Sequence, residues 1–259
     1  MSRASKKLPL HEWYVISLRP LAQHGGVRKN AAKLGARTFA LSTVRLHAIE
    51  AKTSLRQALR CSRVVVTSPA AVRFAQAQIA LGSRPGQRWF ALGAGSAAAL
   101  HRCGIDHVRV PARGSDSEAL LAHEDLRHVH GDRIGLITAP GGRGLLASAL
   151  QARGATLLVA EVYRREVLRP AAARLRALDA LPASSAVLMT SAEAFSVLWR
   201  VLDDAARARL LRRCCVVASD RLAAQARALG FATVLRAADA RPASLLAALA
   251  NHAGVRRFR

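Results

Sequence analysis

The sequence predicts an α/β protein made of two similar domains, each built on a parallel sheet. Short apolar runs rich in Val, Ile and Leu alternate along the chain with Ala- and Leu-rich segments of helical length. Runs that are apolar throughout are typical of parallel strands that helices cover on both faces. The same series of motifs also occurs twice along the chain, which indicates two domains of one architecture.

The expected strands are short and are separated by segments long enough for a helix. Glycine ends several of these helices, as in ALQARGAT and AAQARALGFAT, where Gly154 and Gly230 occupy helix-stop positions. Two further segments, LSTVRLHAIE and VYRREVLRP, have the composition of extended chain and are expected to cross between the domains. The expected core strands are 15–18, 64–66, 90–92, 134–137, 187–189 and 216–218.

The repeated motifs follow the order A, B, A′, B′. In the B units, VTSPAAV is echoed by MTSAEAF, which aligns Ser68 with Ser191 at an offset of 123 residues (191 − 68). Ser96 aligns with Ser219 at the same offset (219 − 96). Because the two kinds of unit alternate, one domain is expected to be inserted into the other. The expected division is 10–45 plus 167–253 for the first domain and 46–166 for the second, with flexible basic ends at 1–9 and 254–259.

The strongly basic composition points to an anionic partner. The formal net charge is +24, and it suits nucleic acid, an anionic membrane surface or a polyanionic small molecule. However, most arginines are scattered among Ala and Leu, as on solvated helix faces, and no nucleic-acid-binding motif is present. We therefore expect no nucleic-acid partner and no membrane partner.

Compartment and metal chemistry also follow from the composition. The N-terminal segment lacks the apolar core of a signal peptide, and no apolar run approaches the ~18 residues of a membrane span. A cytoplasmic location is therefore expected. The four cysteines form no C-x-x-C pair, so we expect reduced thiols and neither a disulfide framework nor a metal site.

Residues that follow the expected strands share one chemistry. The carboxyl ends of parallel strands meet beside helix N-termini, which offer free N–H groups and a positive dipole. Hydroxyls, glycines and arginines at these positions suit the binding of anions. Each serine taken alone is explained as a helix N-cap, whereas the repetition at four strand ends favours a shared ligand site. The candidate binding residues are Arg19, Thr67, Ser68, Gly95, Ser96, Gly141, Gly142, Arg143, Thr190, Ser191 and Ser219.

Two nucleotide motifs are incomplete, and one tyrosine stands out. Gly93-x-Gly95 lacks the rest of a G-x-G-x-x-G pattern, and APGGRG lacks the Lys-Ser/Thr pair of a P-loop, so neither nucleotide site is expected. Tyr163 is one of only two tyrosines and lies at an expected crossing between the domains. It is either an ordinary strand aromatic or a donor of a proton or hydrogen bond to a ligand.

Seven motifs occur in a fixed order from about residue 13 to about residue 250. They are VTSPAAVRFA, ALGAGSAAAL, SDSEALL, APGGRGLLASALQARGA, VAEVYRRE, MTSAEAF and VVASDRLAAQARALGF. In this order they resemble the uroporphyrinogen-III synthase family. The resemblance implies two flavodoxin-like domains joined by a two-strand connector, with the active site in a cleft between them. It implies a lyase of tetrapyrrole (haem) biosynthesis that uses no cofactor.

The implied reaction fits the candidate residues. Hydroxymethylbilane, a linear tetrapyrrole with eight carboxylates, loses water, its ring D is inverted through a spiro intermediate, and the macrocycle closes as uroporphyrinogen III. The resemblance assigns Tyr163 as the catalytic residue that assists departure of the hydroxyl, and Ser68, Ser96, Ser191 and Ser219 as substrate contacts. It further implies a monomer that receives hydroxymethylbilane by transient hand-over from hydroxymethylbilane synthase.

The chain departs from the family pattern in two places, and other functions stay open on the residues alone. Where some members read G-P-T-T-A, this chain has an acid, Asp220, after Ser219, and Ala70 stands where some members carry arginine. The acid replaces a second hydroxyl of the family pattern, which puts that contact in doubt. The alternatives are a two-domain binding protein for an anionic small molecule and, on charge alone, a nucleic-acid-binding protein.

Overall fold

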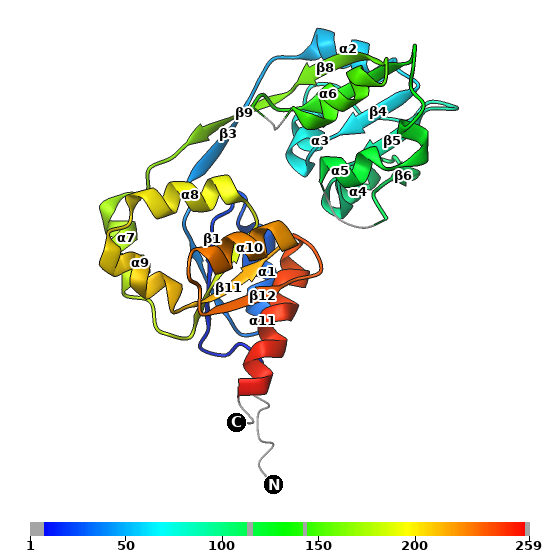
Figure 1. Cartoon of the computed structure of the whole chain (residues 1–259). Coiled ribbons are helices and arrows are strands. Elements are labelled where there is room, and N and C mark those ends of the chain that lie inside the picture. The colour runs from blue at the N-terminus through cyan, green and yellow to red at the C-terminus, as the bar shows by residue number, and fades with distance from the viewer. Residues whose placement is uncertain (1–7, 113–115, 142–143, 257–259) are drawn as a thin grey trace. The chain divides into compact units, whose positions relative to one another are not determined.

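The computed structural model describes residues 8–112, 116–141 and 144–256. The chain divides into two compact units: unit 1 consists of Met1–Arg45 and Glu166–Arg259, and unit 2 consists of Leu46–Arg165. Each unit contains a five-stranded parallel sheet, and strands β3 (Val44–Ala48) and β9 (Tyr163–Val167) form a separate two-stranded sheet at the two points where the chain passes from one unit to the other (Figure 1). The expected α/β class with two parallel-sheet domains and a two-strand connector is confirmed.

The sheet of unit 1 has the order β12-β11-β10-β1-β2, and all of its strand pairs are parallel. Numbered along the unit, this is the order 2-1-3-4-5 of flavodoxin-like folds. The register places Ser17 beside Leu188 and Leu188 beside Val216, so β1, β10 and β11 end at one edge. The strands are β1 (Tyr14–Ser17), β2 (Arg37–Ala40), β10 (Ser185–Met189), β11 (Cys214–Val217) and β12 (Thr233–Arg236).

Helices cover both faces of this sheet. Figure 1 shows α7 and α9 on one side of the strands and α1 and α11 on the other, where α1 packs against α11. The helices of unit 1 are α1 (Gly25–Lys33), α7 (Ala172–Asp179), α8 (Ala192–Val201), α9 (Asp204–Leu211), α10 (Asp220–Ala228) and α11 (Pro242–Arg256). In the described part of the chain, no helix is both long and apolar enough to span a membrane.

The sheet of unit 2 has the order β6-β5-β4-β7-β8 and is also parallel throughout. Its strands are β4 (Arg63–Val66), β5 (Arg88–Ala91), β6 (Val108–Arg109), β7 (Arg133–Thr138) and β8 (Thr156–Glu161). Its helices are α2 (Lys52–Leu59), α3 (Pro69–Gln76), α4 (Ala94–His101), α5 (Ser117–Leu121) and α6 (Leu145–Ala152), with a 3-10 turn at Glu124–Leu126.

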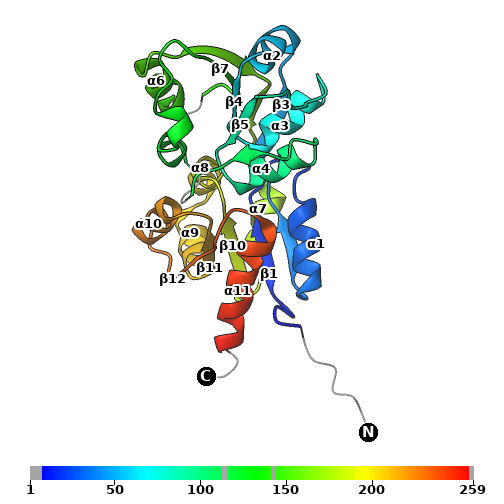
Figure 2. The ribbon, with the colours of Figure 1, turned by 90° about the vertical axis from the view of Figure 1, so that its right-hand side faces the viewer.

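Alternation along the strands of unit 2 builds a core on each face of its sheet. Val64 and Val66 pack with α2, α3 and α4, whereas Val65 packs with α5 and α6. Figure 2 shows α6 on one side of the sheet and α2 and α3 on the other. Because successive side chains of a strand point to opposite faces, a strand of three valines contributes to both cores. This explains why its sequence is apolar throughout.

Two expectations about chain ends and edges need correction. Residues 254–256 belong to α11, which extends to Arg256, so they are not part of a flexible end. The edge strands β2, β6, β8 and β12 were not among the expected strands. These strands are only partly buried, as the half-exposed pattern of β2 shows, so their sequences lack the continuous apolar runs of the central strands.

Candidate functional site

The carboxyl ends of β4, β5 and β7 in unit 2 bring several of the expected residues to one edge. The register pairs Val66 with both Ala91 and Ile137, so the residues that follow them leave the sheet at the same level. Thr67 continues this alignment, since its backbone N–H donates to the Ile137 carbonyl at 3.2 Å. Its hydroxyl lies 2.9 Å from the hydroxyl of Thr138.

Ser68 combines a capping role with a contact to Tyr163. Its hydroxyl accepts a hydrogen bond from the Ala71 N–H at 3.0 Å, which caps α3, and Pro69 occupies the first position of that helix. The same hydroxyl lies 3.0 Å from the Tyr163 hydroxyl. The sequence left open whether Ser68 is a cap or a ligand residue, and the geometry shows a cap that also holds the candidate catalytic tyrosine.

Tyr163 is held on three sides. It belongs to β9, only 2% of its surface is exposed, and its ring stacks on Phe74 of α3 with centroids 5.3 Å apart. Arg165 lies two residues further along the strand, on the same face, and its guanidinium donates to the Tyr163 hydroxyl at 3.3 Å. The phenol oxygen therefore contacts a cation and a hydroxyl, which fix the position of the Tyr163 hydroxyl.

The glycines of the candidate set lie near the same edge, but Ser96 does not occupy the position expected for it. Gly93 is the N-cap of α4, and Ser96 lies inside the first turn of the helix with 3% of its surface exposed. The expectation that Ser96 matches the capping Ser219 is wrong. Strands β5 and β11 begin 126 residues apart (214 − 88), not 123, so the alignment slipped by three residues.

Backbone geometry explains two of the glycines. A Cβ at Gly95 would approach the Pro69 ring to 3.3 Å, so Gly95 lets the first turns of α3 and α4 pack closely. Gly141 is exposed and has a φ of 75°, in the left-handed region that glycine adopts most easily. Gly142 and Arg143 lie outside the described residues.

The remaining candidates belong to unit 1 and lie at the carboxyl ends of its strands. Ser191 caps α8 by accepting from the Ala194 N–H at 3.3 Å, and Ser219 caps α10 by accepting from the Leu222 N–H at 3.3 Å. Thr190 directly follows β10 and is partly exposed. These residues form a second group of hydroxyls at helix N-termini.

Arg19, after β1, is the cationic member of the unit 1 group. Its Nη2 donates to the Ala240 carbonyl at 2.6 Å. Its Nε is buried and finds no hydrogen-bond partner among the described residues, and burial lowers the pKa of the guanidinium. Arg19 is therefore only partly satisfied by the protein, which suits a residue that also binds an anion.

Sequence reasoning missed three residues of this site. Gly93, Phe74 and Arg165 were not among the candidates. Arg165 had a usable signal, because residues two apart on a strand share a face. Phe74 had none, since its contact with Tyr163 joins a helix to a strand about 90 residues away in the chain.

Comparison with known proteins identifies the family. The family model described as uroporphyrinogen-III synthase HemD matches residues 27–247. The chain belongs to the uroporphyrinogen-III synthase family. Its function is that of a uroporphyrinogen-III synthase, an enzyme of haem biosynthesis, and the alternative of a binding protein is not favoured.

Relatives and solved structures agree with this assignment. The uroporphyrinogen-III synthase of Salmonella typhimurium is 34% identical over 193 residues, covering 72% of this chain and 77% of the relative. That of Escherichia coli is 33% identical over 183 residues, covering 69% and 74%. Crystal structures of uroporphyrinogen III synthases from Thermus thermophilus (a mutant) and Helicobacter pylori share the fold, with TM-scores of 0.62 and 0.59 at 20% and 14% identity, and each covers 94% of this chain and 99% of its own.

Proposed function

We propose that the chain converts hydroxymethylbilane to uroporphyrinogen III, with Tyr163 as the catalytic residue. The observation that carries the proposal is the hydrogen-bonded group at the start of α3, in which the Tyr163 hydroxyl lies between Ser68 and Arg165. In this reaction the hydroxymethyl C–O bond breaks, and the leaving oxygen needs a proton to depart as water. A phenol suits that transfer, because its O–H is a proton donor whose position Ser68 and Arg165 fix.

The rest of the reaction requires little from the protein beyond positioning. The pyrrole nitrogen supplies the electron pair that expels the hydroxyl, and the resulting cation attacks the substituted α-carbon of ring D to form the spiro intermediate. The bond from that carbon to the bridge of ring C then breaks, and the released bridge carbon, now cationic, bonds to the free α-carbon of ring D. Loss of a proton from the closed ring restores the pyrrole and balances the proton that left with water. The protein has to hold a flexible polyanion in the conformation that closes with inversion, and it does so mainly by electrostatics and positioning.

Helix N-termini and hydroxyls are proposed to hold the substrate carboxylates. The support is that Ser68 and Gly93 cap α3 and α4 in unit 2, while Ser191 and Ser219 cap α8 and α10 in unit 1. Each of these N-termini offers backbone N–H groups to an anion. We propose no substrate contact for the side chain of Ala70, because it has no polar group.

Asp220 changes the start of α10 in a specific way. Its carboxylate lies 3.0 Å from the Arg236 guanidinium, and 92% of the Asp220 side chain is exposed. The acid adds negative charge to the first turn of α10, which lowers the affinity of that N-terminus for a substrate carboxylate. We therefore propose that Ser219 contributes less to substrate binding in this chain than a hydroxyl pair does in other members.

The test of Tyr163 has a matched control in the chain. Tyr14, the only other tyrosine, also accepts a hydrogen bond from an arginine, at 3.0 Å from Arg37, but it lies on β1 of unit 1. Freshly generated hydroxymethylbilane is supplied and the product isomers are separated. Tyr163→Phe is expected to lower kcat for isomer III by about a hundredfold or more, the usual contribution of a general acid, whereas Tyr14→Phe keeps the wild-type rate.

The outcomes separate the catalytic residue from the activity. Unchanged turnover of Tyr163→Phe removes Tyr163 from the mechanism. Formation of isomer I alone by the wild-type protein, at the spontaneous rate, refutes the proposed reaction. Circular dichroism of both variants confirms that each remains folded.

We also propose that the enzyme acts as a cytoplasmic monomer that receives hydroxymethylbilane directly from hydroxymethylbilane synthase. The support is chemical: the hydroxymethyl group ionises readily, so a substrate released into water closes without inversion. Size-exclusion chromatography with light scattering tests the monomer. Varying the ratio of hydroxymethylbilane synthase to this chain tests the hand-over. The hand-over predicts that the fraction of isomer I falls as the two concentrations approach each other.

A further inference from the structure

A cavity lies within unit 1 at the carboxyl edge of its sheet, the edge at which Arg19, Thr190, Ser191 and Ser219 also lie. Its volume is about 730 Å³, and its lining includes the carboxyl end of β2, the start of α1 and the segment that leads from β9 into α7. None of the candidate binding residues lines it. A volume of this size is in the range of small-molecule sites in proteins.

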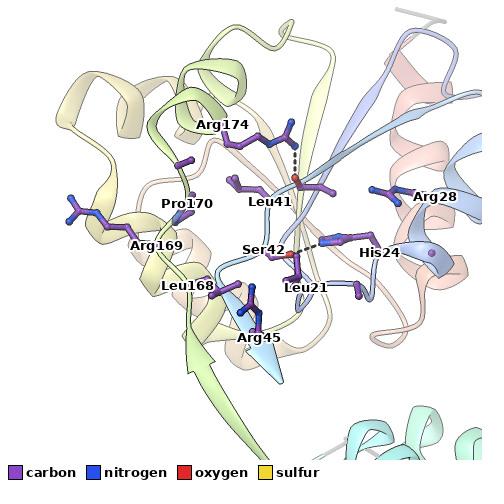
Figure 3. Close-up of a pocket in the computed structure, with 14 residues that line it drawn as sticks. Leu21, His24, Arg28, Leu41, Ser42, Arg45, Leu168, Arg169, Pro170 and Arg174 are labelled. Carbon is purple, nitrogen blue, oxygen red and sulfur yellow. Dashed lines mark hydrogen bonds between the residues drawn. The ribbon is translucent and has the colours of Figure 1, made fainter. Parts of the chain in front are cut away.

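The charge of the lining is entirely of one sign. Four arginines and no carboxylate occur among the 14 lining residues. Figure 3 shows Arg28, Arg45 and Arg174 on three sides of the hydrogen bond between His24 and Ser42, whereas Arg169 points away from them. Arg45 is also 3.9 Å from Glu166, so its charge is only partly available. Like charges held around one space raise the local positive potential, which an anion relieves.

Neighbouring groups fix the cationic wall. Arg174 donates to the Ala40 carbonyl and lies over the Phe39 ring, with its Cζ 4.1 Å from the ring centroid. The imidazole of His24 is 5% exposed and lies within hydrogen-bond distance of both Ser17 and Ser42, at 2.9 and 2.8 Å. Burial and then the charges of Arg28, Arg19 and Arg174 lower the pKa of His24. These contacts keep the Ser42 hydroxyl at the cavity wall.

Two helix N-termini also contribute to the lining. Helix α1 begins at Gly25 and α7 follows its N-cap Ala171, and both residues line the cavity. Neither helix has a side-chain capping hydrogen bond. Their positive ends therefore add to the field of the arginines rather than being neutralised by a capping side chain.

The remaining lining is apolar, with Leu21, Leu41, Leu168 and Pro170 as its largest members. A bare inorganic ion makes no use of these side chains. A ring or short hydrocarbon that carries the anionic groups contacts both kinds of lining.

We propose that this cavity is a second ligand site, which binds a small molecule with an apolar ring and carboxylate or phosphate groups. Carboxylate and phosphate share the geometry that guanidinium recognises, through paired N–H···O bonds. The proposal concerns unit 1 alone and does not depend on the reaction proposed above.

The test measures binding of three probes to the full chain by isothermal titration calorimetry at low salt. Benzene-1,2-dicarboxylate and phenyl phosphate carry the two anionic groups on a ring, and benzamide is the neutral counterpart. At least one of the two anions is expected to bind, while benzamide does not. The anion that binds more tightly identifies whether carboxylate or phosphate is the natural group. Absence of binding by both anions, or equal binding of benzamide, overturns the proposal.

Matched variants place the binding in the cavity. Arg28→Gln removes a lining charge from the exposed side of α1, and Lys29→Gln removes a charge from the same helix outside the lining. Arg174→Gln and Arg176→Gln form the same pair on α7. Each lining variant is expected to weaken anion binding by about tenfold or more, and each control by less than about twofold. Equal weakening in lining and control variants shows binding to general charge and overturns the proposal. If Arg174→Gln fails to fold, the comparison of Arg28→Gln with Lys29→Gln tests whether the anion binds in the cavity.

Discussion

Replacing Ser68 with alanine removes two interactions that the structure assigns to one hydroxyl. The first is the cap of α3, through the Ala71 N–H at 3.0 Å, and loss of such a cap costs about 1 kcal/mol. The second is the contact with the Tyr163 hydroxyl at 3.0 Å. Tyr163 is 2% exposed, so its hydroxyl loses a partner that water does not readily replace.

The second loss is smaller than that of a hydroxyl left with no partner. Arg165 still donates to the phenol oxygen at 3.3 Å, so only part of the hydrogen bonding of Tyr163 is lost. We take about 1 kcal/mol, at the low end of the range for an unsatisfied buried group. The total is about 2 kcal/mol, and for a unit of about 120 residues this lowers Tm by roughly 8 °C.

Ser191→Ala is the matched control, because Ser191 caps α8 through the Ala194 N–H at 3.3 Å but lies in unit 1. Its expected cost is that of a cap alone, about 1 kcal/mol. Denaturant unfolding followed by circular dichroism gives both values, and hydrogen exchange at the Ala71 amide reports the α3 cap directly.

A double-mutant cycle isolates the tyrosine contact. Ser68→Ala combined with Tyr163→Phe is expected to show a coupling free energy of about 1 kcal/mol, whereas Ser191→Ala combined with Tyr163→Phe shows none. A coupling below about 0.3 kcal/mol in the first pair refutes the reasoning, because Ser68 is then only a cap.

Three further predictions concern packing and titration. Gly135→Ala is expected to destabilise unit 2 by about 3 kcal/mol in denaturant unfolding, because its Cβ would lie 2.1 Å from a carbonyl oxygen of α2. Gly82 has open space around it, so Gly82→Ala is expected to change the free energy of unfolding by less than about 0.5 kcal/mol. The pKa of His24 in the folded protein lies below 6.5, so the unfolded chain binds the proton more readily. Stability is therefore lost as the pH falls from about 7.5 to about 5.5, and the dependence of Tm on pH over this range is expected to be flatter for His24→Gln. Burial raises the pKa of Cys215 to about 12. Iodoacetamide at about pH 8 is therefore expected to label the partly exposed Cys103 in the folded protein and to leave Cys215 unmodified, as measured by peptide mass spectrometry. Labelling of Cys215 at the rate of Cys103 contradicts this expectation.

The central strands and the caps were predictable because their causes are local. Val64, Val65 and Val66 are apolar throughout since both faces of their sheet are covered, and Thr-Ser-Pro after them is a local start signal for α3. The positions of Gly154 and Gly230 were likewise fixed by local backbone demand, since both have positive φ at helix ends.

The alignment of Ser96 with Ser219 failed because similarity of composition is a weak guide to register. Both segments are rich in Ala and contain one serine, but Gly93 caps α4 while Ser219 caps α10. The N-cap of each helix depends on where the preceding strand ends. The sequence of a short apolar strand locates its end only to within about three residues.

The distribution of arginines could not be predicted, because position in the fold, not sequence, separates their roles. Arg213 closes a run that looks like a solvated helix face, yet it is 7% exposed and donates to the carbonyls of Leu178, Asp179 and Leu181 at the end of α7. Its role is structural, since it satisfies carbonyls that the helix leaves open.

Other arginines serve a site, and they too are separated by the fold. Arg28 and Arg174 are 146 residues apart (174 − 28) and line one cavity, while Arg165 supports the hydroxyl of Tyr163. A net charge of +24 treats these residues as equivalent, and it indicated only an anionic partner of unspecified kind. Substitution of surface arginines outside these groups should therefore lower the net charge with little effect on either site, because charges separated by more than a Debye length of ~8 Å are largely screened at physiological salt.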